Sequence, residues 1–167
     1  AKENNVSLKF EAAVAGGIPI IKPLTESLYG NGINSIRAIL NGTTNFILTK
    51  MDRENLSYEE ALKEAQKLGF AEANPESDVM GYDAARKLAI LSSLAFDKKF
   101  QWSDISIEGI TNIDENDFKY ASKLKCKIKL VAESFKCKKG IYTSVKPILV
   151  DQESILANIN NEVNAVI

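Results

Sequence analysis

Apolar positions follow two different periods along the chain, and each change of period marks an expected element. A period near 3.6 predicts helices over 23–29, 46–53, 57–68, 79–96 and 115–124. Alternation, or short apolar runs, predicts strands over 7–14, 33–40, 127–135, 141–145, 147–151 and 159–167. The mixture favours an α/β (α+β) fold, in which a mixed, largely antiparallel sheet has helices packed on one face.

Local signals define several of these boundaries. Ser57 followed by Glu60 forms a capping box, which predicts a helix whose inward positions extend to Leu68. Gly69 then ends that helix, because glycine readily takes the left-handed conformation found there. The turn at 138–140 joins two strands as a hairpin. The alternating lysines of strand 127–135 are expected on a solvated face, because no aromatic residues lie between them.

The stretch 65–87 combines a helix end, an acidic loop and a helix start. The loop places Glu72 and Asp78 close together, and Asp78 is the expected N-cap of the next helix. Asp83 and Lys87 follow one turn apart on a shared face. Such a pair is usually a solvated ion pair. Here the rest of the helix is almost wholly apolar, so a desolvated lysine acting in proton transfer is the alternative.

Two further turns have simple structural interpretations. The segment 41–45, Asn-Gly-Thr-Thr-Asn, lies at a strand-to-helix junction, where Thr43 or Thr44 as N-cap is favoured over contact with a ligand. Gly16 and Gly17 favour a tight turn after the first strand.

Composition narrows the class of protein. The 167 residues are 45% hydrophobic and 26% charged, which is typical of one globular domain, and we expect it to span 1–167. A net charge of −1 gives no basic field for nucleic acid or an anionic membrane. No apolar run reaches the ~18 residues of a membrane span. The absence of histidine argues against the commonest zinc sites. Two cysteines are too few for a disulfide framework, which favours a cytoplasmic location.

The order A-xxx-G-F-A-xx-N-P-xx-D-V-x-G-x-D-xxx-K resembles the signature of homoserine dehydrogenases. It is formed here by Ala65, Gly69, Phe70, Ala71, Asn74, Pro75, Asp78, Val79, Gly81, Asp83 and Lys87. The run F-E-A-x-V-x-x-G-I-P-I, from Phe10 to Ile20, resembles another segment of that family. There the resemblance implies a monovalent cation, commonly sodium, whose ligands would be Glu11, Val14, Gly16 and Ile18.

The resemblance also implies a reaction, the interconversion of L-homoserine and L-aspartate 4-semialdehyde with NAD(P). Lys87 would be the acid and base, held by Asp83, and Glu72 would pair with the substrate ammonium. Asp78 would either do the same or only cap its helix. Thr43 is placed near the substrate pocket.

Two features lead us to expect a catalytic (substrate-binding and dimerisation) domain cut from a longer homodimeric protein. The chain contains no G-x-G-x-x-G turn for a dinucleotide, and it does not begin with methionine. Two alternatives from other classes remain open at this point. One is an amino-acid-binding regulatory module without catalysis, and the other is a pure dimerisation domain.

Overall fold

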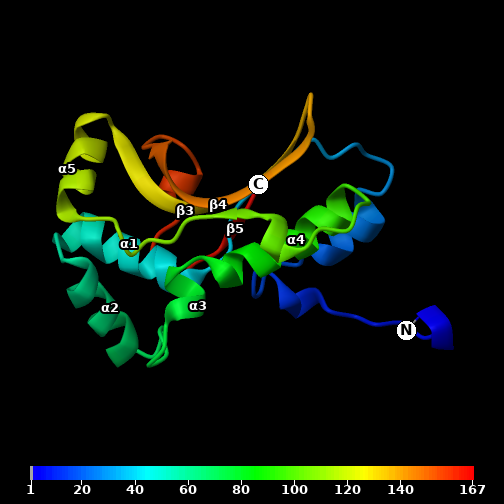
Figure 1. Ribbon diagram of the computed structural model, residues 1–167, viewed down its shortest axis with the longest axis horizontal. Coiled ribbons are helices and arrows are strands. Elements are labelled where there is room, and N and C mark those ends of the chain that lie inside the picture. Colours follow the sequence, from blue (N-terminus) through cyan, green and yellow to red (C-terminus); the bar gives the residue numbers. More distant parts are fainter. Residues whose placement is uncertain (1) are drawn as a thin grey trace.

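The computed structural model describes residues 2–167, which form a five-stranded sheet with helices against one face (Figure 1). Ala1, the first residue of the predicted domain, lies outside the described residues. The strands are β1 (Ser35–Ile39), β2 (Ser106–Ile107), β3 (Cys126–Cys137), β4 (Gly140–Asp151) and β5 (Ala165–Val166). The α-helices are α1 (Gly42–Glu54), α2 (Tyr58–Lys67), α3 (Glu76–Val79), α4 (Tyr82–Ala95) and α5 (Glu115–Lys123).

The sheet has the order β2-β4-β3-β1-β5, and only the β2–β4 pair is parallel. The fold class predicted from the sequence is therefore confirmed. Its centre is the long hairpin β3–β4, which pairs continuously from Cys137 and Gly140 at the turn to Cys126 and Asp151 at the far end. The segments 141–145 and 147–151 were predicted as two separate strands, but both belong to the single strand β4.

The main core lies between the sheet and the helices. Helices α1, α4 and α5 all contact β3, and the fully buried side chains between them include Ile47, Leu88 and Leu91. The opposite face of the sheet is partly covered by the 3-10 turn η5 (Leu156–Asn158), which lies above the left part of the sheet in Figure 1. Within residues 2–167, no helix is both long and apolar enough to cross a bilayer.

Several predicted helix boundaries are confirmed and one inward position is wrong. Ser57 and Glu60 form the capping box of α2, and Gly69 follows that helix with φ of +80°. Leu68, predicted to face inward, is 54% exposed because the helix ends one residue before it. The prediction that 7–14 is a strand was also wrong, since 11–13 form a 3-10 turn (η2, Glu11–Ala13). The carboxylate of Glu11 instead accepts hydrogen bonds from the backbone amides of Ile21 and Lys22.

Two predictions about the second half of the chain also need correction. Only the end of the predicted strand 159–167 pairs with β1, through β5 and two backbone hydrogen bonds between Ile167 and Arg37. The backbone of the preceding residues instead bonds to side chains of α1. The lysines of β3 do not all face solvent. Lys127 forms an ion pair with Asp52, and Lys129 is only 3% exposed. The alternation of the strand did not indicate that a later segment covers this part of the sheet.

Candidate active site

One hollow of about 480 Å³ gathers nearly all the polar residues that the sequence singled out for chemistry. It lies where the start of α1, the loop after α2, the short α3 and the start of α4 converge. The residues that line it are Asn41, Gly42, Thr43, Gly69, Phe70, Glu72, Asp78, Asp83, Lys87 and Glu162. Four carboxylates and one amine therefore face a single space, which suits a ligand that carries an ammonium group.

The amine of Lys87 is held at the inner wall of this pocket. Its Nζ lies 2.7 Å from Oδ2 of Asp83 and donates to the carbonyl oxygen of Leu40 at 3.0 Å. The side chains of Lys87 and Asp83 are 26% and 29% exposed, so the pair is neither fully solvated nor sealed. Two of the three ammonium hydrogens are thus engaged, and the third remains for a ligand oxygen.

Asn41 connects the acidic residues of the pocket to helix α1, and sequence reasoning missed it. Its Nδ2 donates to Oδ1 of Asp78 at 2.7 Å and to Oδ2 of Asp83 at 2.9 Å. Its Oδ1 accepts from the backbone amide of Thr44 at 2.8 Å, so Asn41 is the N-cap of α1 in place of Thr43 or Thr44. At 5% exposure this amide is part of the core as well as of the site. The available signal was its position, an asparagine between a buried strand and a helix start.

Asp78 does not cap the helix that carries Lys87, contrary to prediction. It lies inside α3, and Gly81, with φ of +82°, is the N-cap residue of α4. A side chain at Gly81 would be strained by that φ and would crowd Ile107, so the break between α3 and α4 requires glycine. Burial raises the pKa of Asp78, and the negative charges of Asp83 and Glu72 raise it further, while the Asn41 hydrogen bond opposes the shift. Freed from capping, this carboxylate faces the pocket.

Thr43 and Glu72 also line the pocket. The hydroxyl of Thr43 donates to the carbonyl oxygen of Phe70 at 2.6 Å, which ties the start of α1 to the loop after α2. The carboxylate of Glu72, two residues further along, makes no hydrogen bond or ion pair with the described residues. It is therefore available to a ligand.

Comparison with known proteins identifies the family of this chain. The family model described as homoserine dehydrogenase matches residues 19–167. The chain belongs to the homoserine dehydrogenase family. A homoserine dehydrogenase of Neisseria gonorrhoeae is 48% identical over 166 residues, which cover 99% of this chain and 38% of that relative. This chain therefore spans about two fifths of the length of its curated relatives.

Solved homoserine dehydrogenases have the same fold. The crystal structure from Thiobacillus denitrificans gives a TM-score of 0.96 at 44% identity, covering 99% of this chain and 38% of the other. A hyperthermophilic archaeal homoserine dehydrogenase in complex with NADPH gives a TM-score of 0.80 at 33% identity, covering 99% and 46%. The signature residues 65–87 all lie within the part of the chain that the family model matches.

The four residues that the resemblance assigned to a cation lie apart from this pocket, since none of them lines it. Val14 is fully buried, and Ala15 and Gly16 form a turn with φ of +61° and +59°. The amide of Ile18 closes this turn on the carbonyl oxygen of Ala15. No cluster of three or more His, Cys, Asp or Glu within residues 2–167 is arranged to hold a metal ion, so a cation here would depend on main-chain oxygens.

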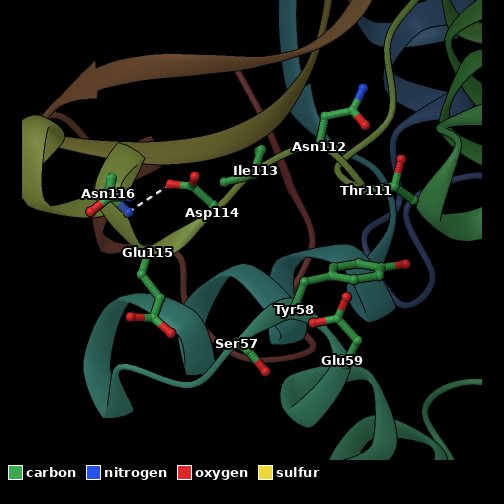
Figure 2. A pocket seen from close by; sticks show the side chains of 9 residues that line it. All are labelled: Ser57, Tyr58, Glu59, Thr111, Asn112, Ile113, Asp114, Glu115 and Asn116. Atoms are coloured by element: carbon green, nitrogen blue, oxygen red, sulfur yellow. Dashed lines mark hydrogen bonds between the residues drawn. The ribbon is translucent and has the colours of Figure 1, made fainter.

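A second hollow, between the starts of α2 and α5, contains none of the predicted site residues (Figure 2). Two of the residues that line it, Ser57 and Asp114, are helix N-caps. Asp114 accepts hydrogen bonds from the amides of Asn116 and Asp117, and the α2 capping box lies on the other wall. The candidate active site of this homoserine dehydrogenase chain is therefore the pocket around Lys87, which is lined by five of the predicted site residues.

Proposed function

We propose that this chain is the substrate-binding part of an enzyme that interconverts L-homoserine and L-aspartate 4-semialdehyde with NAD(P). The observation that carries the proposal is the amine of Lys87, which is fixed by Asp83 and the carbonyl of Leu40 and has one hydrogen left for the pocket. The alcohol proton must move when hydride moves, so a positioned acid and base is needed at that oxygen.

Five polar side chains of the pocket have a task in this reaction. Glu72 and Asp78 hold the ammonium group of the substrate, because charge-assisted hydrogen bonds are stronger than neutral ones. Lys87 gives its free proton to the aldehyde oxygen during reduction and takes the proton from the alcohol during oxidation. Asp83 keeps the amine in place in both directions. Thr43, fixed at the pocket edge through Phe70, offers its hydroxyl oxygen to the substrate.

The nicotinamide group, when bound, supplies and accepts the hydride. This chain has no glycine-rich strand-to-helix turn for its pyrophosphate. We therefore place the dinucleotide site in the part of the relatives that extends beyond this chain. An archaeal relative described as a complex with NADPH supports a nicotinamide cofactor.

A monovalent cation, which we take to be sodium, is proposed at Glu11 and the main-chain oxygens of Val14, Gly16 and Ile18. The Oδ1 atom of Asn164 is buried without a hydrogen-bond partner among the described residues, and the amide nitrogen of the same side chain lies close to the Gly16 turn, so an unsatisfied oxygen belongs to a side chain beside this turn. Hard cations prefer such oxygen ligands. The test is thermal unfolding at constant ionic strength. Sodium should raise the Tm of the wild type but not that of Glu11→Gln, and equal shifts would remove the site.

A homodimer and a cytoplasmic location complete the proposal. The sheet face opposite the helices is covered only partly by η5, which leaves room for a second copy. Light scattering at several concentrations tests the dimer, and a monomer at all of them would reject it. The thiols of Cys126 and Cys137 are unpaired, which fits a reducing compartment.

The decisive experiment compares Lys87→Met with wild type in the protein that also carries a nucleotide-binding domain. Loss of the acid and base should lower turnover of homoserine by ~100-fold or more. Calorimetry should find homoserine binding largely retained, because Glu72 and Asp78 remain. Wild-type turnover in the variant would remove Lys87 from the mechanism. Binding of another amino acid without any turnover by wild type would favour a regulatory module.

A further inference from the structure

Lys129 is the most deeply buried charged group among the described residues, and the mechanism above does not use it. Its Nζ donates to the carbonyl oxygen of Ile159, to Oδ1 of Asn45 at 3.1 Å and to Oδ1 of Asn160 at 3.3 Å. All three partners are neutral oxygens, and Lys129 forms none of the ion pairs found in residues 2–167. A buried ammonium that binds only neutral oxygens costs free energy, which points to a specific role.

Asn45 of α1 binds the same stretch of chain from the other side. Its Nδ2, in a side chain that is 1% exposed, lies 2.8 Å from the carbonyl oxygen of Asn161, 3.2 Å from that of Ile159 and 3.3 Å from that of Val163. The backbone curves around this amide, with Asn161 at φ of +59°. One turn further along α1, Thr49 accepts the amide hydrogen of Asn161 at 3.1 Å.

The segment held in this way, 159–163, forms part of the pocket wall. Glu162 lines the pocket, and its carbonyl oxygen packs against Gly42, the first residue of α1. A side chain at Gly42 would bring its Cβ within 2.6 Å of that oxygen, so the two backbones are in close contact. The next residue, Thr43, also lines the pocket. The width of the pocket at this point is therefore set by where the segment lies.

We propose that Lys129 and Asn45 are positioning residues that fix the segment 159–163 as a wall of the substrate pocket. This rests on the proposed function for the identity of the substrate, but not for the role of the wall. Neither side chain lines the pocket, so both act through the backbone between them. Loss of either side chain should therefore weaken substrate binding more than it slows the chemical step.

The test compares Lys129→Met with Lys127→Met in the full-length protein. The control removes an amine from the same strand that pairs with Asp52 at 2.7 Å and donates no hydrogen bond to the described residues of the segment. Hydrogen exchange at the Asn161 amide should be at least ~10-fold faster in Lys129→Met and unchanged in the control. The KM for homoserine should rise by about fivefold or more, while kcat stays within about twofold.

Unchanged exchange at Asn161, or faster exchange with an unchanged KM, overturns the proposal. If Lys129→Met does not fold, Asn160→Ala decides the matter, because it removes only one acceptor of the amine and should shift exchange and KM in the same direction by less. Wild-type values for that variant would also overturn the proposal. If the wild-type enzyme does not oxidise homoserine, the proposed function fails, and exchange alone decides whether Lys129 holds the segment.

Discussion

Replacing Lys129 by methionine should change how the stability of this protein depends on pH. Methionine keeps most of the length and apolar stem of lysine but removes the amine and its three hydrogen bonds. At neutral pH the variant leaves the buried Oδ1 of Asn45 without a donor, whereas the carbonyl oxygen of Ile159 keeps its hydrogen bond from Asn45 Nδ2. One unsatisfied buried group costs about 1–3 kcal/mol. Lys129→Met should therefore be less stable than wild type at pH 7.

The difference in unfolding free energy between wild type and Lys129→Met should increase at alkaline pH. Burial lowers the pKa of Lys129 from 10.5 to about 8; the negative charge of Asp52 opposes this shift, while the positive charges of Arg53 and Lys127 add to it. Between pH 8 and 10.5 the unfolded chain keeps this proton while the folded chain has lost it, so the free energy of unfolding rises with pH. A shift of 2.5 pKa units corresponds to about 3 kcal/mol, and only the wild type gains it.

Urea unfolding at half-unit steps from pH 6.5 to 10.5 measures the effect. The difference in unfolding free energy between wild type and Lys129→Met should be constant below pH 7 and should grow steadily above pH 8. Lys127→Met retains Lys129 and should therefore retain the rise. A difference that stays constant up to pH 10.5 would refute the reasoning, because it would mean that Lys129 holds its proton equally in the folded and unfolded chains.

Three other substitutions test the site and the framework. Asn41→Ala removes the amide shared by Asp78 and Asp83. It should lower kcat/KM by ~10-fold and move the acid limb of the pH–rate profile upward, since that hydrogen bond lowers the pKa of Asp78; an unmoved limb would contradict this. Ser57→Ala breaks the α2 capping box and should lower the free energy of unfolding in urea by about 1 kcal/mol. An unchanged free energy of unfolding would mean that the start of α2 is already frayed in the wild type. Leu88→Ala, at a fully buried position of α4, should cost about 2–5 kcal/mol, and a smaller cost in the same assay would mean that the core closes around the gap.

The features that the sequence revealed are those whose physics is local. The capping box at Ser57 joins residues three apart, and it is present. Asp83 and Lys87 lie one turn apart on α4, so their contact could be expected before their position in space was known. The hairpin was predictable for the same reason, because a glycine turn lies between two alternating runs.

The features that were missed join distant parts of the chain. Asn41 reaches Asp78 and Asp83 across 37 and 42 residues, and no short motif links an asparagine to acids so far away. The burial of Lys129 depends on Asn45, 84 residues earlier, and Ile159, 30 residues later. Strand alternation places a lysine on one face of a sheet, but whether water or another segment covers that face is decided by the rest of the chain.

The first turn of α1 controls both sides of the substrate pocket. Asn41 caps this turn and holds the acidic residues of α3 and α4, while Asn45, one turn later, holds the segment that carries Glu162. Gly42 lies between them, in contact with the backbone of that segment. A displacement of α1 would therefore move the acids and the opposite wall together. The pocket can keep its shape only if the buried contacts of α1, including those of Asn45 with Lys129, stay intact, and for this reason a residue outside the pocket can govern substrate affinity.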